Sequence, residues 1–534
     1  MRVVDIWTGR RASALRIALR MTNEEYAQHL GTVVRTVAKW NAQPDLVPLP
    51  ELQRALDTAL SLASEQEQTR FAILSDDQPR AVSTEPHRPE YSAESTEVNL
   101  RLTQNQAIDE ALHWLDARMS WRNGEARMRV RAALQELNKD AFDALAHRRA
   151  GVTQAQTASA LGEYYRLKGS GPYRFYSAIS GETRHMTSVL TKNQWLDLSI
   201  PLGVGQDHLA FTPDTPLTGH RNLGQGAATA AVRRLAETVA LGTRFVNLPL
   251  YWLLDADVSC SGLRGEVGTT SFVDYALTLD LLENELIDAI SGGNSTLPGA
   301  LPLRDRYLPD LPTLTDFKRR ICVGGSVTLT AIARPHTNRH PMTPDYVLLV
   351  QERSGHVLNA ARRLAVIPKA FHQPLVDVTD DAQILATIER EMEEELLGRP
   401  ELDTTDHEQL SADPMHATKL SEPMRWLTDH SDQHIWRTEC VGFGINAMSG
   451  NYEFASLLVI DDESWWSLYG GAVEANWETH GLRCYSSRDA NTLTDLISSP
   501  EWSNEGIFAF IQGLRRLRQI GGKRVALPPI ELEF

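Results

Sequence analysis

Apolar residues recur at steps of three and four positions along much of the chain before Pro309–Pro312, and this spacing favours amphipathic helices. Beyond that segment the pattern changes to short runs of apolar, β-branched residues, which predict strands. The runs that predict helices include 99–119, 125–149, 230–246, 271–290 and 504–518, and those that predict strands include 319–335, 345–354, 363–371, 439–450 and 454–462. One strong helix is expected among the strands, over Asp380–Leu397, with Thr379 as its N-cap and Gly398 at its end.

The chain of 534 residues is too long for a single core, so several domains are expected. Residues 75–99 are rich in Pro, Ser, Thr and Glu, and such a composition buries too little apolar area to order itself. We therefore predict a multidomain protein. Its parts are an all-α helix-turn-helix domain in 1–74, a flexible linker in 75–99, a mostly helical domain in 100–312 and an α+β domain with a C-terminal helix in 313–534.

The segment Thr22–Gln43 has the spacing of a helix-turn-helix. Ala27 is small enough for two helices to cross closely, and Gly31, four residues later, suits the sharp turn between them. Val37 and Trp40 then hold the second helix against the core. With these positions fixed, the residues expected to face DNA are Thr32, Val34, Arg35, Thr36 and Lys39.

This segment resembles the helix-turn-helix of the XRE (Cro/C1-type) regulator family, over about residues 8–66. The resemblance implies that Val33–Asn41 is a recognition helix for the major groove of double-stranded DNA. Charge agrees with this expectation, because residues 9–39 contain six Arg or Lys and two Glu, whereas the whole chain has a net charge of −16. A helical hairpin without a DNA partner is the alternative.

The overall composition, with 42% hydrophobic and 23% charged residues, is that of an ordinary water-soluble protein. No apolar run is long enough for a membrane span, and the N-terminus lacks the apolar core of a signal peptide. The four cysteines are far apart and form no CxxC pair, which indicates reduced thiols. We therefore expect a cytoplasmic protein with no membrane partner.

Five glutamates crowd the end of the helix expected at Asp380–Leu397. An α-helix places three of them on one face, namely Glu391, Glu394 and Glu395, whereas Glu389 and Glu393 are expected to be exposed. Converging carboxylates repel each other unless a cation neutralises them, and Mg²⁺ or Mn²⁺ prefers such oxygen ligands. A solvated acidic face is the alternative.

The run REMEEELLG resembles the second half of the Nudix box, and Arg390–Glu395 match its Arg-Glu-apolar-any-Glu-Glu core. The order of the expected strands is also similar to that of a Nudix fold, over about residues 316–485. The resemblance implies that Arg390 braces the neighbouring loop. It further implies a metal ion held by Glu391, Glu394 and Glu395.

The first half of the box departs from the family pattern. Val376 stands where a glycine is expected, and Ala382 stands where a glutamate is expected, with Asp381 next to it. The closing glycine, Gly398, arrives one residue late, and Pro368–Pro374 replaces the usual Pro-Gly-Gly approach. These changes leave a Nudix-like fold plausible and weaken the case for hydrolysis.

The segment Phe443–Phe454 joins a strand to a loop that contains two glycines, two asparagines and three aromatic residues. Such a loop can line a nucleotide pocket. The residues expected to bind a ligand there are Tyr452 and Phe454, whose rings can stack a base, and Glu453, which brings a further carboxylate. A plain hairpin is the alternative.

Taken together, the patterns favour a homodimeric, DNA-binding transcriptional regulator whose degenerate Nudix-like domain senses a phosphorylated small molecule. The alternative is a metal-dependent Nudix-type hydrolase of a nucleoside-diphosphate-linked substrate. In a third interpretation, both modules bind other proteins. The sequence assigns no chemistry to residues 100–312.

Overall fold

In the computed structural model the chain divides into two compact units, Met1–Glu90 and Tyr91–Phe534. The described residues are 7–19, 21–30, 32, 34–42, 46–48, 52–53, 56, 59–60, 63, 71, 102, 105–136, 139–167, 171–203, 207–213, 223–335, 343–353, 363–397, 415–416, 419–430, 435–470, 473 and 479–533. The linker predicted at 75–99 therefore lies outside the described residues.

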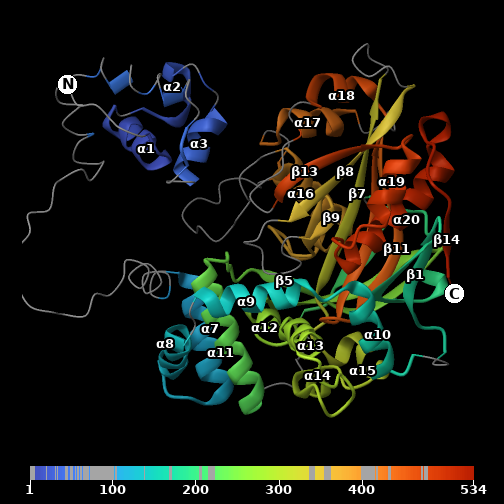
Figure 1. Cartoon of the computed structure of the whole chain (residues 1–534). Coiled ribbons are helices and arrows are strands. Elements are labelled where there is room, and N and C mark those ends of the chain that lie inside the picture. The colour runs from blue at the N-terminus through green and yellow to red at the C-terminus, as the bar shows by residue number, and fades with distance from the viewer. Residues whose placement is uncertain are drawn as a thin grey trace, which may run out of the picture. The chain divides into compact units, whose positions relative to one another are not determined.

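The first unit contains three helices in the segment predicted to be a helix-turn-helix, and Figure 1 draws them in blue. They are α1 (Gly9–Ala18), α2 (Asn23–Leu30) and α3 (Val34–Ala42). Tyr26 connects them, because its hydroxyl donates to Ala12 O at 3.0 Å and its ring lies 6.5 Å from that of Trp40. Gly31, expected at the turn, lies outside the described residues. The core of the unit includes Trp7, Ala12, Leu15, Ala18, Tyr26, Ala27, Leu30, Val37 and Trp40.

The second unit is built on an 11-stranded mixed sheet. Its main path runs β13–β8–β7–β12–β11–β2–β1–β14, and the short strands β10, β3 and β9 pair with β7, β11 and β8. The pair β7 and β12 is parallel, whereas the other pairs are antiparallel. The strands are β1 (Arg174–Ser180), β2 (Thr183–Thr191), β3 (Ile200–Pro201), β7 (Gly324–Arg334), β8 (Asp345–Arg353), β9 (Leu364–Val366), β10 (Lys369–Phe371), β11 (Trp436–Asn446), β12 (Asn451–Ile460), β13 (Thr479–Ser486) and β14 (Ile530–Leu532).

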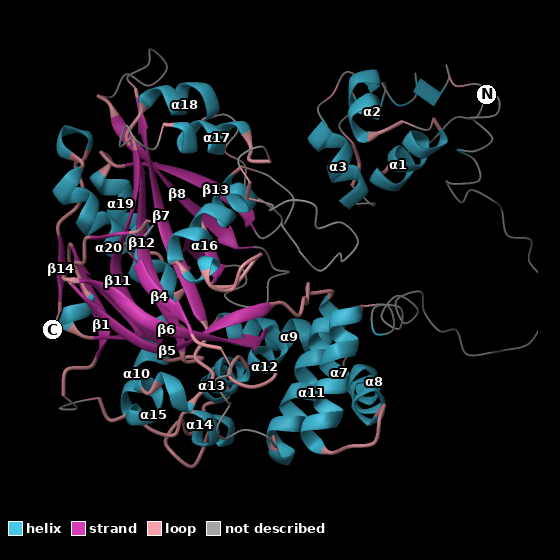
Figure 2. Ribbon diagram, turned by 180° about the vertical axis from the view of Figure 1, so that it is seen from behind, coloured by secondary structure: helices cyan, strands magenta, loops and turns pink. Residues whose placement is uncertain are grey.

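A smaller sheet of three strands, in the order β4–β6–β5, lies beside a group of helices at the lower end of Figures 1 and 2. Its strands are β4 (Asp207–Phe211), β5 (Pro249–Ser259) and β6 (Gly262–Ser271). The helices of the unit are α7 (Gln106–Met119), α8 (Glu125–Glu136), α9 (Lys139–Ala150), α10 (Gln154–Tyr164), α11 (Gly224–Leu241), α12 (Phe272–Ala276), α13 (Leu281–Ser291), α14 (Pro302–Tyr307), α15 (Leu311–Thr315), α16 (Ile384–Glu391), α17 (Glu422–Asp429), α18 (Glu463–Tyr469), α19 (Ala490–Ile497) and α20 (Asn504–Ile520). No helix within the described ranges is long and apolar enough to cross a membrane.

The large sheet separates two cores. On one face α20 packs against β7, β9, β11 and β12, and on the other face α16 packs against β7 and β10 (Figure 2). Side chains along β12 alternate between the two cores. Leu457 and Val459 lie in the core with α20, whereas Tyr452 and Phe454 lie in the core with α16. The core with α16 is continuous with that of the helices before residue 312.

Strands β1 to β6 occur in the region predicted to be mostly helical. β1 and β2 form a hairpin whose turn contains Gly181 at φ +60°, a conformation that favours glycine. They pair with β14 and β11, so strands from both sides of the predicted boundary near residue 312 share one sheet, and the boundary lies inside a compact unit. The sequence pattern missed these strands because a short apolar run such as that in β5 has no periodicity that separates a buried strand from a buried helix.

Candidate functional site

Helix α3 presents polar residues outward and apolar residues inward. Arg35 and Lys39 are exposed and Thr36 is half-buried, whereas Val37 and Trp40 are each 1% exposed. The spacing therefore produces the two faces that the sequence predicts for this helix. Of the other residues expected to face DNA, Thr32 precedes α3 and is half-buried, and Val34 is the first residue of α3.

The acidic helix is shorter than predicted. Asp380–Ala382 forms a separate 3₁₀ turn, Gln383 is extended at ψ 137°, and the α-helix begins at Ile384. Thr379 makes no side-chain cap. The cap comes instead from Asp207 on β4, whose Oδ2 accepts the N–H groups at the start of α16, so a distant strand rather than the local sequence decides where this helix begins. The predicted end at Gly398 lies outside the described residues.

The end of the acidic helix is a π-helical turn, Met392–Leu396, and it changes where the glutamates point. Glu393, expected to be exposed, is fully buried, and its Oε1 accepts both the N–H and the hydroxyl of Ser421 at 2.9 Å. Glu389, also expected to be exposed, is half-buried. Burial and the nearby charge of Asp207 raise the pKa of Glu389 to about 7.

The three predicted metal ligands contact protein donors. Glu391 Oε1 accepts from Arg390 at 2.9 Å, and Glu394 lies 4.0 Å from the same guanidinium. Glu395 Oε2 accepts the backbone N–H of Lys369 at 2.8 Å. Within the described part of the chain, no three His, Cys, Asp or Glu side chains form a group that holds a metal ion. These contacts therefore hold the three carboxylates against Arg390 and the backbone of strand β10.

The segment Phe443–Phe454 forms the β11–β12 hairpin, and its aromatic rings are enclosed. Tyr452 and Phe454 are fully buried, with ring centroids 5.5 Å apart, and the Tyr452 hydroxyl lies 2.9 Å from His372 Nδ1. Neither ring has a free face for a base, which disagrees with the predicted stacking role. The physical reason is that the helical region covers the sheet here, which strand patterns alone do not reveal.

Two buried arginines hold the tip of this hairpin, and the sequence analysis does not single them out. Arg304 is fully buried and donates to Ala447 O at 2.7 Å, and Arg320, 1% exposed, donates to Gly450 O at 2.5 Å. Both arginines come from the helical region before β7, so they fasten that region to the sheet. An arginine beside apolar residues gives no sequence signal that distinguishes this role from a surface one.

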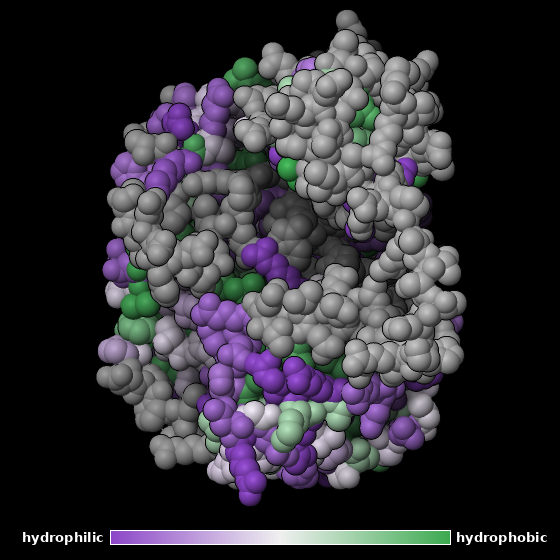
Figure 3. Space-filling view, turned by 90° about the vertical axis from the view of Figure 1, so that its left-hand side faces the viewer, coloured by the Kyte–Doolittle hydropathy of each residue, from purple (hydrophilic) through white to green (hydrophobic). Residues whose placement is uncertain are grey.

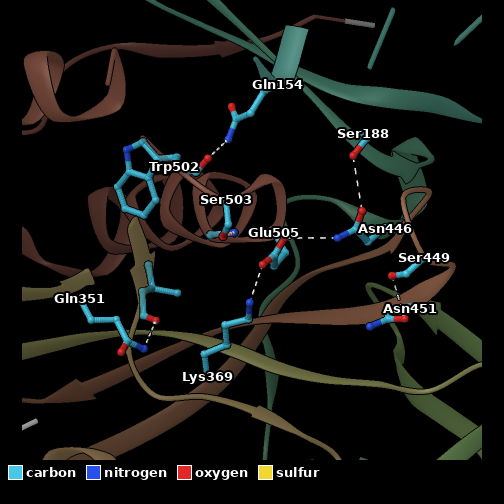
Figure 4. A network of polar contacts seen from close by, with 12 residues as sticks. Gln154, Ser188, Gln351, Lys369, Asn446, Ser449, Asn451, Trp502, Ser503 and Glu505 are labelled. Atoms are coloured by element: carbon cyan, nitrogen blue, oxygen red, sulfur yellow. Dashed lines mark hydrogen bonds and ion pairs between the residues drawn. The ribbon is translucent and has the colours of Figure 1, made fainter. Parts of the chain in front are cut away.

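Because side chains alternate along β12, Glu453 lies on the opposite face of the sheet from Tyr452 and Phe454. Its carboxyl interacts with the charges of Glu505 and Lys369, which belong to the polar network shown in Figure 4. Lys369 forms an ion pair with Glu505 at the start of α20, and Asn446 Nδ2 donates to Glu505 at 3.3 Å. Burial alone would raise the pKa of Glu505, but the charge of Lys369 and its hydrogen bond lower it below the usual value.

Glu453 itself is 6% exposed and forms no hydrogen bond to another described residue. Burial and the charge of Glu505 raise its pKa well above the usual value, and the charge of Lys369 opposes this shift. Lys369 connects this network to the acidic turn, because its backbone N–H donates to Glu395.

No protein-family model matches this chain, and a search of curated proteins finds no match either.

Proposed function

We propose that the protein is a DNA-binding transcriptional regulator in which the first unit binds double-stranded DNA and the second unit senses a phosphorylated small molecule. The observation that carries the DNA part is the division of α3 into an inner face with Val37 and Trp40 and an outer face with Arg35 and Lys39. A helix held in this way can enter the major groove with its basic residues forward.

For the second unit we propose a Nudix-like fold around β7, β8, β11 and β12. What supports it is the mixed sheet with the acidic helix α16 on one face and α20 on the other. A sensor suits this unit better than a hydrolase, because the three glutamates are engaged by Arg390 and β10, and Ala382 is fully buried at the position where the box expects an acid.

The DNA proposal is tested by gel shift with the region upstream of the protein's own coding sequence. If Arg35 makes a bidentate base contact, Arg35→Ala should weaken binding by about 1–3 kcal/mol, and adding Lys39→Ala should weaken it further. The matched control is Lys318→Ala with Arg319→Ala, which removes two exposed positive charges from the second unit. Equal affinity in both double variants contradicts the proposal.

A further inference from the structure

A cavity of about 550 Å³ lies among α9, α11, α13 and α14, in the region to which the sequence assigns no chemistry. Its volume is within the range of pockets that bind small molecules, and such pockets are common between packed helices. Leu223, Ala227 and Leu281 form part of its apolar wall, and several charged side chains complete it.

The acidic side chains of the wall are held by the protein itself. Glu285 accepts two backbone N–H groups at the start of α14, at 2.7 and 2.9 Å. Asp288 accepts two hydrogen bonds from Arg149, at 2.6 and 2.7 Å. Glu237 accepts Arg233 Nε at 3.0 Å and lies 3.7 Å from Arg149. These hydrogen bonds fix the shape of the wall, and Asp288 and Glu237 are paired with the positive charges of Arg149 and Arg233.

Two exposed arginines stand at different ends of the cavity. The side chain of Arg233 is 51% exposed and uses Nε for Glu237. Arg306 lies over the ring of Tyr307, and its Nη1 is 3.3 Å from the place where a Cβ on Gly224 would stand. This guanidinium therefore lies against the first residue of α11, where the helix end also carries partial positive charge. An anion at this end of the cavity would lie close to both positive groups.

The helix α11 sets the length of the molecule that fits. Gly224 and Arg233 are nine residues apart on this helix, which corresponds to about 13 Å along its axis. Small residues such as Ala227 and Ala230 line the wall between them. The cavity therefore suits an elongated molecule with an anionic group at one end and an apolar or planar body.

We propose that this cavity is the ligand site of the second unit, with the phosphate of a phosphorylated small molecule at Arg306 and the body of the molecule along α11 toward Arg233. This inference rests on the proposed sensing function and places the ligand in the helical region, away from Glu391, Glu394 and Glu395. The enclosed rings of Tyr452 and Phe454 are in keeping with a site elsewhere.

The test is isothermal titration calorimetry of the full chain without DNA, using pyrophosphate, ADP and adenosine as probes. We expect pyrophosphate and ADP to bind, and ADP to bind at least tenfold more tightly than adenosine. Arg306→Ala should abolish the difference between ADP and adenosine. Gly226→Trp should weaken ADP binding by narrowing the cavity, and a Cβ at this position meets no atom within 4 Å.

Arg319→Ala, which removes an exposed arginine outside the cavity, is the matched control and should bind all probes as the wild type does. The inference is overturned if pyrophosphate does not bind at millimolar concentration, if Arg306→Ala binds ADP as tightly as the wild type, or if Arg319→Ala weakens binding equally. DNA is absent from the calorimetry, so a negative result there does not affect the gel-shift result. The ligand site and the DNA-binding proposal can therefore fail separately. Equal circular dichroism spectra of the variants exclude misfolding as the cause of a loss.

Discussion

Replacing Asp207 tests how the three-stranded sheet holds the acidic helix in place. Its carboxylate accepts the N–H groups of Ile384 and Leu385, at 2.6 and 3.3 Å, in a buried position. Removing this cap leaves both donors without their acceptor, and loss of an N-cap costs about 0.5–2 kcal/mol. We therefore expect Asp207→Ala to lower the free energy of unfolding by roughly 1–2 kcal/mol at pH 5.

The negative charge of Asp207 destabilises the folded state, because the carboxylate is buried, whereas its hydrogen bonds to α16 stabilise it. Burial raises the pKa of this carboxyl from 3.8 to about 6, although the hydrogen bonds from Leu385 and Ile384 oppose the shift. The folded protein therefore binds the proton of Asp207 more tightly than the unfolded chain does, and protonation stabilises the folded state. This contribution to the free energy of unfolding is complete below pH 3.8 and is lost as the pH rises through about 6. A shift of this size corresponds to at most about 3 kcal/mol. Asp207→Asn keeps an acceptor and removes the titration.

The assay is urea unfolding of the full chain at pH 5 and pH 8, followed by circular dichroism. Asp207→Asn should resemble the wild type at pH 5 and exceed its stability at pH 8, while Asp207→Ala should be less stable than Asp207→Asn at both. Glu389 also has a pKa that burial raises, so both variants should still lose some stability between pH 5 and pH 8. Equal stability of the Ala and Asn variants would refute the capping role, and a wild type that is more stable at pH 8 would refute the electrostatic one.

Three further predictions follow from the packing and from the acidic turn. Replacing Glu391, Glu394 and Glu395 together by Gln should abolish any rise in melting temperature caused by Mg²⁺ or Mn²⁺ alone, and identical responses of variant and wild type would mean that these residues bind no metal. Arg304→Met leaves Ala447 O without its guanidinium donor and should destabilise the protein by about 2–4 kcal/mol, so an unchanged thermal transition contradicts the clamp. Since one helix-turn-helix covers one half-site, light scattering should give twice 59.6 kDa, and a monomer at micromolar concentration argues against a homodimer.

The local parts of the fold could be predicted from the sequence. The strands β7 and β8 lie within the predicted runs, and β11 and β12 overlap theirs but begin three residues earlier, because each is an apolar stretch between polar segments. The helix predicted at 504–518 is present as α20, which begins at the predicted residue and continues to Ile520. Val37 and Trp40 are buried as predicted, since a spacing of three residues puts both on one helix face.

The rest depended on contacts between distant segments, which a pattern of neighbours does not contain. The start of α16 is decided by Asp207, which stands far away in the sequence. Glu393 is buried because Ser421 supplies its donors, although a run of glutamates normally indicates an exposed face. Tyr452 was expected at a ligand, but the helical region encloses it. Figure 3 shows hydrophilic side chains over much of the lower part of the face on which α8 lies.

The central claim, that α3 binds DNA through its outer face, is tested most directly by the salt dependence of DNA affinity. Fluorescence anisotropy with the upstream DNA, measured over a series of salt concentrations, gives the slope of log affinity against log salt. Each phosphate contact contributes about 0.9 to this slope, so Lys39→Ala should reduce its magnitude by roughly 1 if Lys39 neutralises a phosphate. The charge-matched control Lys318→Ala should leave both affinity and slope unchanged. An equal slope in wild type and Lys39→Ala, or no salt-dependent binding at all, would contradict the account.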